Sequence, residues 1–258
     1  MFLYPPIIRN EPSMKRHIPN FVTLCNLLSG VVGIWFVLEH NPYYGALLIF
    51  LAAMFDFADG FLARQLKAYS NVGKSLDSLA DMVSFGVLPG FLVFRLQTMS
   101  NGFGLGNEWI PDLTVIEMLF IITPLIIPAF SAIRLARFDN DTRQTNEFRG
   151  LPTPANAIFI SAWVYSYPAL QNIFPWLYLN WAIFVLSTLL AVLLITDIPM
   201  FSLKFKSFGV KENSLRYIFL MLSLLSIIIL NIPGIMLVIA LYIVLSVIRN
   251  LGPKLNIG

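Results

Sequence analysis

Long apolar runs separated by short polar links dominate the chain. Eight runs come within a few residues of the roughly 20 that a helix needs to cross a hydrocarbon core of about 30 Å. They lie at 20–38, 43–63, 77–98, 115–136, 156–173, 177–198, 215–231 and 233–249. The pattern therefore predicts an all-α polytopic membrane protein, a bundle of about eight transmembrane helices.

The composition agrees with a membrane protein and excludes other classes. Of the 258 residues, 57% are hydrophobic and only 12% are charged, whereas soluble domains carry about 25% charged residues. Disordered chains are rich in charge and poor in apolar residues, so disorder is excluded as well. The single cysteine, Cys25, rules out a disulfide framework, and two histidines make a histidine-based zinc centre unfavourable.

The basic residues predict the orientation in the membrane. With eight spans, sixteen of the seventeen Lys and Arg residues lie on one side, and Arg95 is the exception. The positive-inside rule makes this side cytoplasmic. We therefore expect a multi-pass protein of the cell membrane with both termini in the cytoplasm. The net charge of +3 reflects this topology, and we expect no nucleic-acid partner.

Four carboxylates stand at the predicted cytoplasmic ends of two adjacent spans. Asp56 and Asp59 end the second span, and Asp77 and Asp81 begin the third. At 100° per residue, the two acids of each pair share one face of their helix. Small residues lie between them and leave room for a ligand. The sequence thus predicts two facing helices that each present two carboxylates.

Four neighbouring carboxylates need nearby positive charge to reduce their repulsion. Each Asp costs about 2.5–3.5 kcal/mol at the bilayer centre, and neighbouring acids repel one another. Oxygen ligands without His or Cys suit Mg²⁺ or Mn²⁺, and four carboxylates can hold two ions that assist a phosphoryl transfer. Two alternatives stay open: helix-end acids paired with nearby Arg and Lys residues, or the ion site of a cation channel or transporter.

The spacing of these acids also resembles a known signature. The pattern Asp56-x2-Asp59-Gly60-x2-Ala63-Arg64-x8-Gly73-x3-Asp77-x3-Asp81 is similar to that of the CDP-alcohol phosphotransferases. The resemblance implies two divalent ions on the four Asp residues, with Asp81 also acting as general base. It further implies that the CDP-linked lipid contacts Gly60, Ala63, Arg64 and Gly73, together with Thr23 and Asn26 of the first span.

Several flanking segments resemble the membrane-embedded phosphatidylserine synthases within this family. Among them are Asp81-Met82-Val83-Ser84-Phe85-Gly86-Val87, Arg134-Leu135-Ala136-Arg137-Phe138 and Phe148-Arg149-Gly150-Leu151-Pro152-Thr153-Pro154. The resemblance covers about residues 15–210 and implies a six-helix core at 18–210 and a homodimer. The hydropathy pattern adds a tail or interfacial segment at 1–17 and two additional transmembrane helices at 211–258. The resemblance also implies CDP-diacylglycerol as donor and L-serine as acceptor. Glycerol 3-phosphate and inositol phosphate stay open as alternative acceptors.

Serine carries a carboxylate, which needs a cation in its binding site. Arg134 and Arg137 lie three residues apart near the end of the fourth span, so both can face one cavity. We expect at least one of them to bind the carboxylate of serine, and Arg149 is a further candidate.

Overall fold

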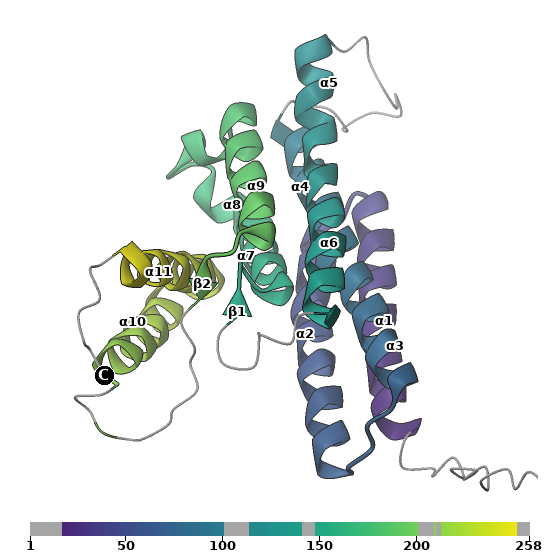
Figure 1. Cartoon of the computed structure of the whole chain (residues 1–258). Helices are drawn as coiled ribbons and strands as arrows, with labels where there is room; N and C mark the ends of the chain where they lie inside the picture. The colour runs from purple at the N-terminus through teal and green to yellow at the C-terminus, as the bar shows by residue number, and fades with distance from the viewer. Residues whose placement is uncertain (1–16, 101–113, 141–147, 201–208, 210–212, 252–258) are drawn as a thin grey trace, which may run out of the picture.

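Residues 17–100, 114–140, 148–200, 209 and 213–251 are described by the computed structural model, and they are largely helical (Figure 1). The first half contains α1 (His17–Leu38), α2 (Pro42–Gln65), α3 (Asn71–Asp81), η2 (Met82–Val87), α4 (Leu88–Ser100), α5 (Val115–Ile122), η3 (Thr123–Leu125) and α6 (Ile126–Asn140). The second half contains α7 (Thr153–Tyr165), α8 (Tyr167–Leu170), η5 (Pro175–Tyr178), α9 (Asn180–Ile195), α10 (Ser214–Leu230) and α11 (Ile232–Leu251). Two short strands, β1 (Phe148–Arg149) and β2 (Pro199–Met200), pair antiparallel.

The prediction of a helical membrane protein is confirmed. Within the described residues, five helices are long and apolar enough to cross a membrane: His17–Leu38, Pro42–Gln65, Asn71–Ser100, Val115–Phe138 and Ile232–Asn250. The third joins α3, η2 and α4, and the fourth consists of α5, η3 and most of α6. Two further apolar helices, α9 and α10, are shorter. The described structure thus supports the helical class, with five of the eight predicted spans at full length.

The predicted span 156–173 differs from the structure. Helix α7 ends at Tyr165 after 13 residues, which is about 20 Å at 1.5 Å per residue. A turn at Ser166 then leads into α8, which has a proline at its start. Proline suits the first turn of a new helix and does not continue an old one. The apolar run is therefore divided between two helices.

Helix α1 packs against both α2 and the α3–η2 segment. At Gly30 of α1, an added Cβ would lie 2.6 Å from Oγ and 2.9 Å from Cα of Ser84 in η2. The Ser84 hydroxyl donates to the Asn26 carbonyl oxygen at 2.9 Å. Since only glycine permits this approach, Gly30 brings the backbones of α1 and η2 into contact. The contact lies one turn from Asn26.

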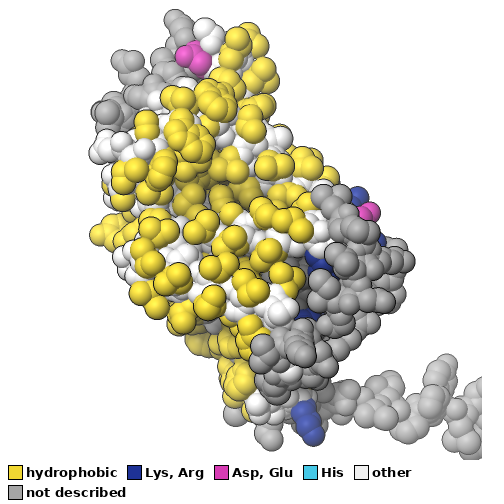
Figure 2. Space-filling view, turned by 90° about the vertical axis from the view of Figure 1, so that its left-hand side faces the viewer, with side chains coloured by type: hydrophobic (Ala, Val, Ile, Leu, Met, Phe, Trp, Pro, Cys, Tyr) yellow, Lys and Arg dark blue, Asp and Glu magenta, His cyan; other side chains and the backbone are white. Residues whose placement is uncertain are grey.

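The apolar surface has two faces, one inward and one toward lipid. Inside, Trp163, Phe85 and Leu92 are fully buried in one continuous core. Outside, large apolar residues such as Phe57, which is 71% exposed, point away from the protein. Figure 2 shows a face covered mostly by hydrophobic side chains, with Lys and Arg toward its lower and right-hand edges. This distribution is that of a protein surrounded by hydrocarbon.

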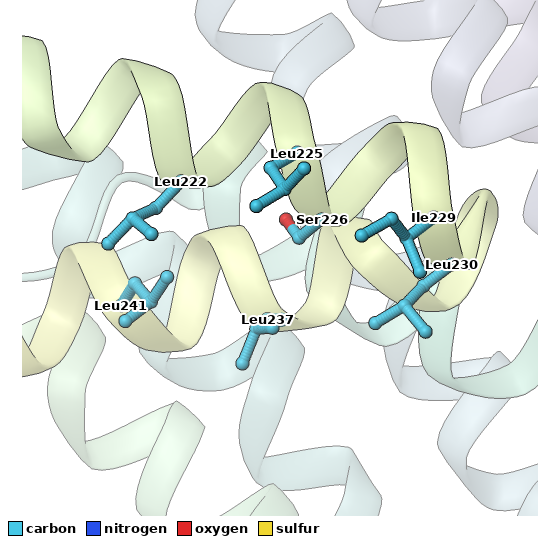
Figure 3. Close-up of a pocket in the computed structure, with 7 residues that line it drawn as sticks. All are labelled: Leu222, Leu225, Ser226, Ile229, Leu230, Leu237 and Leu241. Atoms are coloured by element: carbon cyan, nitrogen blue, oxygen red, sulfur yellow. The ribbon is translucent and has the colours of Figure 1, made fainter.

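Helices α10 and α11 form a pair that joins the rest through α11. Helix α11 contacts α7 and β2, and in Figure 1 it runs across the direction of α1, α2 and α6. An added Cβ at Gly234 would lie 2.2 Å from the Ser226 carbonyl oxygen, so glycine permits the close turn between the two helices. The pair forms an apolar groove of about 240 Å³ (Figure 3), lined by Leu222, Leu225, Ser226, Ile229, Leu230, Leu237 and Leu241.

We predict that Gly30→Leu destabilises the protein, because its side chain would meet the backbone of η2. Overpacking of this kind costs about 1–3 kcal/mol in free energy of unfolding. Thermal unfolding in detergent should therefore show a lower Tm than that of the wild-type protein. The control is Val31→Leu, which places the same leucine side chain at a neighbouring residue that is 49% exposed. Equal Tm values for the two variants would contradict the close contact.

Candidate active site

Three carboxylates from two helices converge near the turn between α2 and α3. Asp56 and Asp59 lie in the last turns of α2, and Asp77 lies in α3. Each offers one oxygen atom, and these three atoms lie within 4.8 Å of one another. Asp59 is only 5% exposed, and the other two are partly buried. Asp56 and Asp59 of α2 therefore face Asp77 of α3, as the helical spacing predicts.

The fourth acid, Asp81, lies beside this group and is held from α1. The Asn26 amide nitrogen donates to Oδ1 of Asp81 at 3.2 Å. Asp81 also lies within electrostatic range of Asp56 and Asp77. It is the last residue of α3, and the π-helical turn η2 begins at the next residue. Such π-helical turns are frequent at functional sites, and here the irregular segment directly follows Asp81.

The carboxylate cluster has the chemistry of a divalent cation site. Oδ2 of Asp59 is buried and has no hydrogen-bond partner among the described residues. Three acids within 4.8 Å of one another repel unless a cation or protons reduce their charge. Their donors are all oxygen, as Mg²⁺ and Mn²⁺ prefer. These residues therefore fit a divalent cation, as the sequence predicts.

The predicted nucleotide-contacting residues of α2 and α3 lie around this cluster. The atom nearest to an added Cβ at Gly60 would be Nη1 of Arg64, at 3.6 Å, so the helix surface there is open. Arg64 is exposed and Ala63 is partly buried. Gly73 is more crowded, because an added Cβ would lie 3.0 Å from both Asn20 Oδ1 and Ser70 Oγ. An accessible guanidinium thus lies one turn from an open stretch of backbone.

The polar residues of α1 reach the same place. Thr23 is buried, donates to the Pro19 carbonyl oxygen at 3.1 Å and lies beside the Asp59 carboxylate. Asn26 is fully buried and bonds Asp81. Both therefore support the carboxylates directly, whereas the resemblance implies that they contact the CDP-linked lipid.

The structure separates the three arginines predicted to bind serine. Arg134 is 8% exposed and donates from Nη1 to Oγ1 of Thr153 at 2.6 Å, within electrostatic range of Asp81. Arg137 is exposed and donates to the Ile195 carbonyl oxygen at 3.1 Å, at the end of α9. Arg149 is exposed and lies in β1, opposite Pro199. Of the three, only Arg134 is buried near the carboxylates.

Two further polar residues lie on the two helices that the Arg134–Thr153 hydrogen bond joins, and they were not among the predicted site residues. Ser131 of α6 and Asn156 of α7 are both fully buried. The Ser131 hydroxyl and both amide atoms of Asn156 have no hydrogen-bond partner among the described residues. The signal in the sequence is a polar residue inside an apolar span, but it does not distinguish a ligand contact from a hydrogen bond between helices.

The chain is similar to a family of lipid-modifying enzymes. The sequence model described as CDP-alcohol phosphatidyltransferase matches residues 16–193. This matched segment contains α1 to α7 and all four Asp residues, and it ends before α10 and α11.

Relatives of this chain include proteins named as serine O-phosphatidyltransferases and one named as an archaetidylserine synthase. The CDP-diacylglycerol–serine O-phosphatidyltransferase of Bacillus subtilis is 31% identical over 139 residues, which are 54% of this chain and 70% of that protein. The protein of the same name from Mycobacterium leprae is 33% identical over 192 residues, 71% of this chain and 57% of that protein. The archaetidylserine synthase of Methanothermobacter thermautotrophicus is 31% identical over 147 residues, 56% of each chain. The matches to the last two thus span little more than half of each relative.

We predict that Asp59→Asn weakens divalent cation binding by at least about tenfold, because the substitution removes a charged ligand from the cluster. Titration of the purified protein in detergent with Mn²⁺, followed by the spectroscopic signal of the free ion, measures this change without any substrate. Asp197→Asn is the matched control, since Asp197 is exposed near β2 and outside the cluster. The same Mn²⁺ affinity in both variants would contradict the cation site.

Proposed function

We propose that this chain, which belongs to the CDP-alcohol phosphatidyltransferase family, transfers the phosphatidyl group of CDP-diacylglycerol to the hydroxyl of L-serine and releases CMP. The observation that carries the proposal is the group of four acids on α2 and α3, three of which converge within 4.8 Å. The names of the relatives support serine as the acceptor. The enzyme is a phosphatidylserine synthase of phospholipid biosynthesis.

The reaction is a displacement at phosphorus. The hydroxyl oxygen of serine attacks the phosphorus that carries diacylglycerol, the bond from this phosphorus to the CMP oxygen breaks, and CMP leaves. The proton of the hydroxyl passes to Asp81. The Asn26 amide holds the Asp81 carboxylate at 3.2 Å, which orients the general base toward the attacking group.

Two divalent cations, Mg²⁺ or Mn²⁺, are the proposed cofactors. Asp56, Asp59, Asp77 and Asp81 would hold them, and bound cations would neutralise negative charge on the diphosphate. The residues around the cluster then bind the rest of the donor. Arg64 is accessible for charge-assisted bonds to phosphate. Gly60, Ala63 and Gly73 form the helix surface beside it, and Thr23 and Asn26 support it from α1.

Arg134 is the proposed ligand for the serine carboxylate. It is buried, and a buried guanidinium needs an anionic or strongly polar partner. It also lies within electrostatic range of Asp81, which receives the proton of the hydroxyl. Arg137 bonds the end of α9 and is a weaker candidate, as is Arg149 in β1.

The topology is also a proposal. Eight crossings place the carboxylate cluster at the cytoplasmic face of the cell membrane, because the positive-inside rule assigns both termini and sixteen basic residues to that side. The described residues contain five full-length spans and two shorter apolar helices, and the proposal takes the 13-residue helix α7 as the eighth crossing. The homodimer that the resemblance implies stays a prediction.

We predict that Asp81→Asn lowers turnover by at least about 100-fold, because a general base contributes about 10²–10⁴ to the rate. Binding of CDP-diacylglycerol should remain measurable in the same variant. CMP release and donor binding are measured on the purified protein, with Asp197→Asn as the control. Turnover close to that of the control would remove Asp81 as the base.

We predict that CMP is released from CDP-diacylglycerol with L-serine and not with glycerol 3-phosphate or inositol phosphate. The measurement compares the three acceptors separately with the same protein in detergent. Release with either phosphorylated acceptor and not with serine would change the assignment within the family. Cation flux in liposomes without any CMP release would instead favour a channel or transporter.

A further inference from the structure

A group of buried polar residues joins α6 to α7 next to the proposed serine carboxylate site. Arg134 and Thr153 form the contact, with 2.6 Å between Nη1 and Oγ1. Arg134 lies in the C-terminal half of α6 and Thr153 begins α7. Because the two helices run in opposite directions, residues before Arg134 lie beside residues after Thr153. Ser131 and Asn156 are each three residues, about one turn, from this contact.

These two residues lack partners that burial normally requires. Asn156 is 0% exposed, and neither its amide nitrogen nor its amide oxygen has a hydrogen-bond partner among the described residues. The Ser131 hydroxyl is also buried without one, and so is Nε of Arg134. Buried polar groups are nearly always hydrogen-bonded. Three neighbouring side chains with unfilled bonding capacity thus indicate a site for a polar ligand.

The site is adjacent to the reacting groups. An added Cβ at Gly86 of η2 would lie 3.1 Å from Cβ of Ser131, and η2 directly follows Asp81. Helix α11 closes a further side, because it packs on α7 and brings Tyr242 within electrostatic range of Arg134. The ring of Tyr242 is held by Phe219 of α10, with 6.2 Å between ring centroids.

We propose that Asn156 and Ser131 bind the ammonium group of the acceptor, while Arg134 binds its carboxylate. The inference rests on the proposed function and adds the residues that recognise a free amino acid. An ammonium group is a donor only, and the amide oxygen of Asn156 and the hydroxyl oxygen of Ser131 accept. Helix α11, which lies beyond the residues that the family model matches, covers this site with Tyr242.

The test compares L-serine with a compound that differs from it only in the amino group. CMP release is measured with L-serine, and 3-hydroxypropionate, which lacks the ammonium group, is measured as a competitive inhibitor. In Asn156→Leu, the KM for L-serine should rise at least about tenfold. The KM for CDP-diacylglycerol and the inhibition constant of 3-hydroxypropionate should change less than about threefold. Asn41→Leu is the matched control, because Asn41 is exposed before α2.

A second variant shows whether the effect of substituting Asn156 comes from lost binding of the ammonium group or from a folding defect. Asn156→Asp keeps the size of the side chain and adds a negative charge, so it should retain the KM for L-serine within about threefold and weaken inhibition by 3-hydroxypropionate. An unchanged KM for serine in folded Asn156→Leu, or equal losses for both compounds in either variant, would overturn the inference. If the wild-type protein releases no CMP with serine, the proposed function itself is wrong. If the wild-type protein does release CMP with serine, and the Asn156 variants bind serine and 3-hydroxypropionate in the same ratio as the wild type, only the role of Asn156 is refuted.

Discussion

Electrostatic repulsion among the acids of α2 and α3 is the constraint that organises this protein. Oxygen atoms of Asp56, Asp59 and Asp77 lie within 4.8 Å of one another, at the end of helices whose other residues are suited to lipid. A carboxylate at the bilayer centre costs about 2.5–3.5 kcal/mol, and its neighbours add to that cost. In the proposed function, cations bound there would reduce this repulsion and would also bind the diphosphate of the donor lipid.

The packing of α1 against η2 positions one of these acids, Asp81. Gly30 lets α1 touch the backbone of η2, and one turn away Asn26 donates to Asp81. Because the amide can hold the carboxylate only at hydrogen-bonding distance, the glycine contact and the position of the proposed base are linked. The irregular turn η2 begins directly after Asp81, so the regular part of the helix ends where the chemistry is proposed to occur.

The acceptor side is assembled from segments far apart in the chain. Arg134 of α6 is fixed by Thr153 of α7, and α11 brings Tyr242 from outside the matched family segment. Hydrophobic contacts supply the rigidity, since Trp163 and Leu151 of this region are fully buried. In the proposed function, the matched family segment binds the donor and the C-terminal helix α11 covers the acceptor.

The sequence alone determined the helical membrane class and the facing acids, because hydropathy and the 100° helical repeat depend only on the order of residues. Hydropathy could not show that the run 156–173 is divided at Ser166, because apolar residues on both sides of a turn give the same hydropathy as one continuous helix. Nor could spacing separate Arg134 from Arg137, which lie one turn apart. Only the tertiary structure directed one toward Thr153 and the other toward Ile195. It likewise buried Asn156, one turn after Thr153, because burial depends on which helices pack together.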